Sequence, residues 1–138
     1  MILLDTNVLS EPMRPAPATR VGAWLDAQAL ETLYLSAMTV AELRAGVALL
    51  PTGKRRTALH EQLERQVLPL FAGRVLPFDM ACTQAYAELL ARVRKAGQGI
   101  DTADALIAAV ALANGLMVAT RDTGPFLAAG LRLINPWD

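Results

Sequence analysis

The sequence predicts an α/β fold: a three-layer sandwich in which helices flank both faces of a central five-stranded parallel sheet. Five short apolar runs are separated by stretches of helical periodicity, an alternation typical of β-α-β units. Hydrophobic residues make up 54% of the chain and charged residues 19%, which is enough to bury a sheet on both faces. Because 138 residues suit one domain better than two, we expect a single domain over residues 1–138.

The pattern of apolar residues places each element. Strands are expected at residues 2–4, 33–35, 75–78, 117–120 and 131–134. Helices are expected at residues 8–13, 19–29, 39–50, 53–71, 81–95, 102–114 and 126–129. Pro51, Gly73 and Gly115 follow the ends of three of these helices. Each connection between strands then contains a helix, as parallel pairing requires.

The composition limits the available chemistry. The chain has one cysteine, Cys82, and one histidine, His60, so it offers no internal disulfide and no cysteine-type zinc cluster. Any bound metal would have carboxylate ligands, which favours Mg²⁺ or Mn²⁺. Thirteen basic residues balance thirteen acidic ones, which argues against binding nucleic acid by bulk charge alone. This balance does not exclude an enzyme that meets phosphates through a bound cation.

The first residues and the apolar runs bear on the cellular compartment. The chain begins Met-Ile-Leu-Leu-Asp, without the basic leader of a signal peptide. No apolar run reaches the roughly 18–20 residues that a membrane span needs. We therefore expect a cytoplasmic protein that does not associate with membranes.

Four acidic residues are predicted to share one edge of the sheet. Asp5 follows the first expected strand, Asp122 follows the fourth, and Glu42 and Asp104 lie in the first turns of the helices at 39–50 and 102–114. Helix N-termini meet strand C-termini at the edge where such sheets bind ligands. Carboxylates crowded there raise one another's pKa unless a cation lies between them. We therefore expect a Mg²⁺ or Mn²⁺ site able to activate water and to stabilise phosphoryl charge.

Each acid also has a purely structural interpretation. Asp5 would cap the following helix, and Asp122 would be a turn residue. Glu42 would reach back to the backbone of Thr39 in a capping box, and the 101–104 segment would form a similar cap. Caps need not gather at one end of neighbouring strands, however, so the shared edge favours the metal site.

Four segments, in this order, resemble the motifs of PIN-domain nucleases. They are MILLDTNVLS at 1–10, LSAMTVAELR at 35–44, DALIAA at 104–109 and VATRD at 118–122. The resemblance is closest to the FitB-like branch of the VapC-type toxins in this family. The features that resemble this branch are LPLFAG at 68–73, TRDTG at 120–124 and NPW at 135–137. The similarity covers nearly the whole chain.

The resemblance implies a PIN-like fold and a ribonuclease that hydrolyses RNA phosphodiester bonds with metal-activated water. The implied catalytic and metal-binding quartet is Asp5, Glu42, Asp104 and Asp122, with one or two Mg²⁺ or Mn²⁺ ions. Asp5 and Asp104 are the expected direct ligands, whereas the other two would bind directly or through water. Three further residues would orient the acids or a phosphate, or serve only in turns and caps: Thr6, Asn7 and Thr120.

The resemblance also implies partners. The chain would be the toxin of a type II toxin–antitoxin pair, a homodimer neutralised by a ribbon-helix-helix antitoxin of the FitA or VapB kind. That antitoxin would contact promoter DNA, so this chain would touch DNA only indirectly. The alternative function is a weakly active or non-catalytic scaffold within such a DNA-binding regulatory complex. This sequence departs from the family pattern in one place. Many family members carry a further acid shortly after the fourth motif, whereas this chain has TGPF at 123–126. The departure puts the binding of a second metal ion in doubt.

Other residues leave alternatives open. Arg44 and Arg121 lie near the acids in sequence and would contact a phosphate or pair with a carboxylate. Trp137 would stack on a base or pack against the protein. A phospho-aspartate phosphatase is the nearest enzymatic rival, because Asp5 ends a strand. Asn7 stands where such enzymes carry a second aspartate, which disfavours that rival.

Overall fold

The computed structural model describes residues 1–138 and contains a five-stranded sheet in the order β3-β2-β1-β4-β5. The strands are β1 (Ile2–Leu4), β2 (Leu33–Ser36), β3 (Val75–Leu76), β4 (Met117–Ala119) and β5 (Leu133–Ile134). All four pairings are parallel, which confirms the predicted fold class. β1 is the central strand, and its Leu3 lies opposite Tyr34 of β2 and Val118 of β4.

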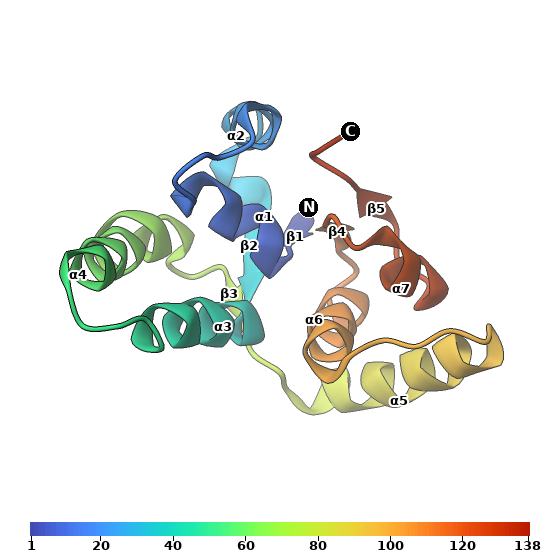
Figure 1. The fold of residues 1–138 in the computed structure, drawn as a ribbon. Coiled ribbons are helices and arrows are strands. Elements are labelled where there is room, and N and C mark those ends of the chain that lie inside the picture. Colours follow the sequence, from blue (N-terminus) through green and yellow to red (C-terminus); the bar gives the residue numbers. More distant parts are fainter.

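Helices cover both faces of the sheet (Figure 1). The α-helices are α1 (Thr6–Ser10), α2 (Thr19–Asp26), α3 (Ala37–Ala48), α4 (Lys54–Glu61), α5 (Met80–Lys95), α6 (Thr102–Ala113) and α7 (Thr123–Ala128). Shorter 3-10 turns span Glu11–Met13, Leu30–Thr32 and Leu68–Phe71, and a π-helix spans Gln62–Val67. None of these helices has the length and apolarity needed to cross a membrane.

The sheet separates two hydrophobic cores because successive side chains of a strand point to opposite faces. Ile2 and Leu4 of β1 belong to the core that also contains residues of α1, α2 and α3. Leu3, between them, belongs to the core formed with α5, α6 and α7. This arrangement gives the three layers that the sequence predicts.

The start of α3 corrects one expectation. The helix begins at Ala37 rather than at residue 39, because Ser36 is its N-cap and its Oγ accepts a hydrogen bond from the Thr39 backbone nitrogen at 3.1 Å. Glu42 therefore lies in the second turn and not in the first. The predicted capping box between Thr39 and Glu42 is wrong.

Prolines explain the other main differences. The expected helix at 53–71 is helical throughout, but it changes from α to π to 3-10 geometry before Gly73. Pro69 lacks the N–H that would continue the α pattern. Pro77 ends β3 two residues early for the same reason. Helix α7 begins at Thr123, three residues before the expected start, with Pro125 in its first turn where the missing N–H costs little.

Two adjacent residues of α7 test the packing of this layer. Phe126 is fully buried in the core with α5 and α6, whereas Leu127 is 59% exposed. We expect Phe126→Ala to lower the free energy of unfolding by about 3–5 kcal/mol, and Leu127→Ala to change it by less than about 0.5 kcal/mol. Urea unfolding of the two variants measures both values. Equal losses would contradict the assignment of Phe126 to the core.

Candidate metal centre

Three of the four predicted acids converge at the carboxyl edge of the sheet. Asp5, Asp104 and Asp122 each offer a carboxylate oxygen, and these oxygens all lie within 4.8 Å of one another. Asp5 follows β1 and Asp122 follows β4, its neighbour in the sheet. Asp104 is in the first turn of α6. Parallel pairing and the position of the α6 N-terminus therefore bring together residues that are far apart in sequence.

Asp5 is the buried member of this cluster, with only 2% of its surface exposed. One oxygen, Oδ1, accepts a hydrogen bond from the Thr6 backbone nitrogen at 2.8 Å, so Asp5 also caps α1. The other, Oδ2, accepts one from the Thr120 hydroxyl at 2.7 Å. The same Thr120 oxygen accepts a hydrogen bond from the Asp122 backbone nitrogen at 3.0 Å. Thr120 thus connects the two acids that follow the central strands.

Glu42 lies beside the three aspartates and is held by a chain of hydroxyl groups. Its Oε1 accepts a hydrogen bond from the Thr6 hydroxyl at 2.7 Å. The Thr6 oxygen lies 3.1 Å from that of Thr39, which lies 3.3 Å from that of Ser36. Because a hydroxyl carries one proton, Thr39 donates to Thr6 and Ser36 donates to Thr39. Aligned donors of this kind strengthen the hydrogen bond to the carboxylate at the end of the chain.

Ser36 and Thr39 are site residues that the sequence analysis did not identify. The available signal was two hydroxyl residues in the run that precedes Glu42. The contact of Thr39 with Thr6, and that of Ser36 with Thr39, depend on the β1–β2 pairing and on the start of α3 at Ala37. A helix starting three residues later would have placed Thr39 at the cap.

Burial, together with crowding of like charges, shifts the pKa of Asp104. Burial is the largest cause, and the negative charges of Asp5, Asp101, Asp122 and Glu42 add to it, so that the pKa of Asp104 rises to about 7. Asp101 is close because it caps α6, its carboxylate accepting a hydrogen bond from the Asp104 backbone nitrogen at 2.9 Å. Near neutral pH, Asp104 without a cation is therefore only partly ionised.

The pKa of Asp5 is also raised, and burial is again the main cause. The hydrogen bonds from Thr120 and Thr6 favour the charged form but do not cancel the effect of burial. The charges of Asp122 and Glu42 raise the pKa further. Glu42 is thus near enough to the cluster to act on it electrostatically.

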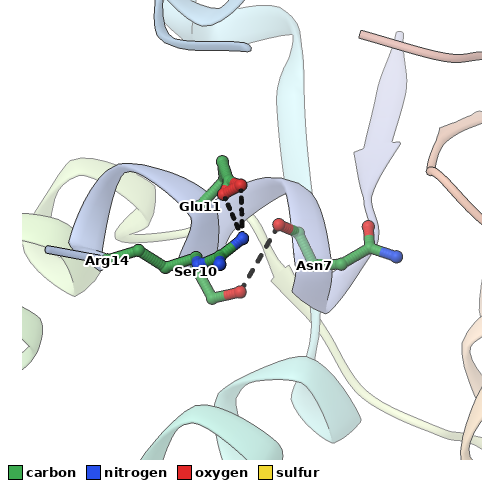
Figure 2. A network of polar contacts seen from close by, with 4 residues as sticks. All are labelled: Asn7, Ser10, Glu11 and Arg14. Atoms are coloured by element: carbon green, nitrogen blue, oxygen red, sulfur yellow. Dashed lines mark hydrogen bonds and ion pairs between the residues drawn. The ribbon is translucent and has the colours of Figure 1, made fainter. Parts of the chain in front are cut away.

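The other buried carboxylate of the chain shows what Asp5 lacks. Glu11 is 3% exposed, and its two oxygens accept hydrogen bonds from Nη1 of Arg14 at 2.9 and 3.2 Å (Figure 2). No ion pair in the structure includes Asp5 or the other three acids of the quartet. Buried negative charge without a counter-ion is costly. A set of carboxylate oxygens with uncompensated charge fits a hard divalent cation such as Mg²⁺ or Mn²⁺.

Asn7 lies in α1, one turn before Glu11. Its side chain points away from the Glu11–Arg14 pair (Figure 2). Its Oδ1 is buried and has no hydrogen-bond partner, while its backbone oxygen accepts a hydrogen bond from Ser10 at 3.4 Å. The Asn7 amide makes no hydrogen bond to the acids, so its orienting role stays a prediction.

The two arginines near the acids have different surroundings. Arg44 pairs with Glu64 at 2.8 Å, so of its two expected roles the structure shows the pairing with a carboxylate. The pair lies beside a hollow of about 530 Å³ between α3 and α4. This hollow is lined by none of the four acids. Arg121 has no carboxylate partner, and its guanidinium lies 5.1 Å from the ring centroid of Trp137.

Comparison with known proteins identifies the family. A profile of the PIN domain matches residues 2–130. The chain is 69% identical over 138 residues to Plasmid stability protein StbB of Pseudomonas syringae pv. tomato and 59% identical over 138 residues to VapC ribonuclease Y4jK of Sinorhizobium fredii. Both alignments cover 100% of this chain and 99% of the relative. The chain therefore belongs to the PIN domain family.

A further relative and a solved structure agree with this assignment. Toxin FitB of Neisseria gonorrhoeae is 58% identical over 137 residues, with 99% of both chains covered. A chain in the structure of FitAB bound to an IR36 DNA fragment superposes with a TM-score of 0.97 at 55% identity, covering 100% of this chain and 96% of that one. The predicted resemblance to FitB-like proteins is thus confirmed at the level of sequence and fold.

The raised pKa of Asp104 predicts a pH-dependent loss of stability in the absence of metal. Between its ordinary value of 3.8 and about 7, the folded protein binds more protons at Asp104 than the unfolded chain does. The contribution of Asp104 to the free energy of unfolding therefore falls as the pH rises through this window and stays low above it. We expect the stability of Asp104→Asn relative to wild type to increase between pH 5 and pH 8.

Urea unfolding in EDTA at the two pH values measures this difference. Asp26→Asn, at an exposed position at the end of α2, is the matched control and should follow the wild type at both. If Asp104→Asn and wild type lose stability in parallel, the pKa of Asp104 is not raised in the folded protein.

Proposed function

We propose that this chain is a Mg²⁺- or Mn²⁺-dependent ribonuclease that acts as the toxin of a toxin–antitoxin pair. The observation that carries the proposal is the cluster of Asp5, Asp104 and Asp122, whose charge no arginine, lysine or histidine of the chain compensates. The family and the relatives called VapC ribonuclease and Toxin FitB support the choice of RNA as substrate.

In this proposal, Asp5, Asp104 and Asp122 hold the cation, with Glu42 at the border of the site. A bound divalent cation would lower the pKa of a water molecule and offset the charge that develops on a phosphodiester. A single compact group of three carboxylates supports one cation position. The segment after Asp122 adds no acid before Asp138, so it offers no obvious ligand for a second cation nearby.

The remaining residues would keep the acids in place for the reaction. Thr120 holds one oxygen of Asp5, and the Thr6 backbone holds the other. Thr6 also engages Oε1 of Glu42, whereas Oε2 of Glu42 has no partner in the protein. We therefore assign Oε2 the task of accepting a proton from the attacking water. The pKa of Asp104 is about 7 in the absence of metal, so cation binding near neutral pH competes with a proton at this carboxylate. The affinity for the cation should therefore fall as the medium becomes more acidic.

The partners follow from the same relatives. The FitAB structure that this chain resembles was solved bound to a DNA fragment. By analogy, we propose that this chain forms a homodimer and binds a ribbon-helix-helix antitoxin. The antitoxin would carry the contacts to promoter DNA. A regulatory complex of this kind is compatible with a nuclease site, which the antitoxin would hold inactive.

Loss of one carboxylate tests the nuclease directly. We expect Asp5→Asn to lower the rate of RNA cleavage in Mn²⁺ roughly 100-fold or more, because it weakens a contribution of several kcal/mol to transition-state stabilisation. Cleavage of a labelled RNA by protein purified free of any partner measures the rate. The control, Asp26→Asn, replaces an exposed aspartate at the end of α2 and should cleave as the wild type does.

Two outcomes would count against this function. Equal cleavage by wild type and Asp5→Asn would show that the acid cluster is not the source of activity. No cleavage by the wild type in Mn²⁺ or Mg²⁺ would favour the non-catalytic scaffold instead. The assay uses several RNA classes, so that the result does not depend on one choice of substrate.

The hydrogen bond from Thr120 to Asp5 gives a second prediction. Thr120→Val keeps the size of the side chain but removes both the donor to Asp5 and the acceptor of the Asp122 backbone N–H. Groups that orient metal ligands typically contribute 10–100-fold to affinity, so we expect Mn²⁺ binding to weaken by about that factor. Titration calorimetry measures it, with Thr83→Val on α5, whose hydroxyl donates to Met80, as the control. Unchanged Mn²⁺ affinity in Thr120→Val would rule out this supporting role.

A further inference from the structure

Arg121 is an exposed arginine at the border of the acid cluster, and it has no ion-pair partner. It lies between Thr120, which donates to Asp5, and Asp122. The ion pairs of the structure use Arg14, Arg44 and Arg65, and no protein group accepts a hydrogen bond from Arg121. Its positive charge is therefore available to a ligand that approaches the cluster.

Trp137 holds the Arg121 side chain in position. The guanidinium carbon lies 5.1 Å from the centroid of the indole ring, within the range of a cation–π interaction. The indole is partly buried against the core that contains α1, α2 and α3. The Trp137 backbone is held at both ends: its nitrogen donates to Asn135 Oδ1 at 3.0 Å, and its carbonyl accepts from Arg20 of α2 at 3.4 Å.

The C-terminal segment thus runs from β5 towards α2 (Figure 1). It brings two arginines to one tryptophan, Arg20 to its backbone carbonyl and Arg121 to its ring. We call Arg20, Trp137 and Arg121 the arginine–tryptophan strip. Stacking uses one face of the Arg121 guanidinium and leaves its in-plane N–H donors free. A planar fork of donors matches the oxygens of a phosphate.

We propose that the arginine–tryptophan strip binds the RNA backbone beside the scissile bond, with Arg121 contacting a neighbouring phosphate. This inference rests on the proposed ribonuclease function and specifies how that site holds a single-stranded substrate. The chain has no net charge, and its acid cluster repels a polyanion, so local cations must offset that repulsion. Arg44 and Arg65 are neutralised by Glu64 and Glu61, whereas Arg121 is not.

Binding of a short fluorescein-labelled single-stranded RNA, followed by anisotropy in EDTA, tests the proposal without cleavage. We expect Arg121→Gln to bind the RNA about five- to tenfold more weakly, as the loss of one charged phosphate contact implies. The slope of log affinity against log salt concentration should fall by about 0.7, the value for one phosphate of a single strand. Arg121→Lys, which keeps the charge but loses the fork, should lie between Arg121→Gln and wild type.

Two further variants separate RNA binding from a structural effect. Trp137→Ala should weaken RNA binding as well, because Arg121 loses its support, while Trp137→Phe should retain most of it. The control is Arg94→Gln, an exposed position on α5 without an ion pair, which should bind as the wild type does. The affinity of Arg121→Gln for Mn²⁺ alone should be no weaker than that of the wild type, since the acids are intact and only a positive charge is removed.

The outcomes distinguish this inference from the function on which it rests. Equal RNA affinity and equal salt dependence in wild type and Arg121→Gln would contradict RNA binding by the strip, even if the wild type cleaves RNA. A parallel loss of Mn²⁺ and RNA affinity would also overturn it, by showing that Arg121 acts on the fold of the site. If Arg121→Gln weakens RNA binding but the wild type does not cleave RNA in Mn²⁺, the result supports RNA binding by the strip and contradicts only the proposed ribonuclease activity.

Discussion

The carboxyl edge of the sheet gathers negative charge for which the protein supplies no counter-ion. Burial and mutual repulsion raise the pKa of Asp5 and bring that of Asp104 to about 7. The other buried acid of the chain, Glu11, is neutralised by an ion pair with Arg14. At the cluster the chain provides hydroxyl and backbone donors instead, which orient carboxylates but do not cancel their charge. A cation from solution would complete such a site.

The fold serves this arrangement through its two central strands. Pairing of β1 with β4 places Asp5 next to Asp122, and Thr120 then connects the two through its single hydroxyl group. Pairing of β1 with β2 brings Thr6 against the start of α3, where Ser36 and Thr39 continue the hydrogen bonds that reach Glu42. The acids are thus positioned by the core of the sheet rather than by flexible loops, which favours a fixed geometry.

The sequence was sufficient to predict the sheet, its parallel strands and the edge where the acids meet, because these follow from the alternation of apolar runs with helices. It could not predict the start of α3, because Ser36 and Thr39 are both good N-cap residues and only tertiary packing chooses between them. Nor could it predict that Arg44 pairs with Glu64 whereas Arg121 stacks on Trp137. Those contacts join segments whose spacing along the chain carries no periodic signal.

Anomalous diffraction from crystals of the full chain soaked in Mn²⁺ would show whether a cation binds between the carboxylates of Asp5, Asp104 and Asp122. We predict a strong peak between these carboxylates, whose oxygens already lie within 4.8 Å of one another. We also predict that Thr120 keeps its hydrogen bond to Asp5 when the ion is present. Crystals grown near pH 8 that show Mn²⁺ only at other surface positions, with these three carboxylates unliganded, would contradict the proposed metal site.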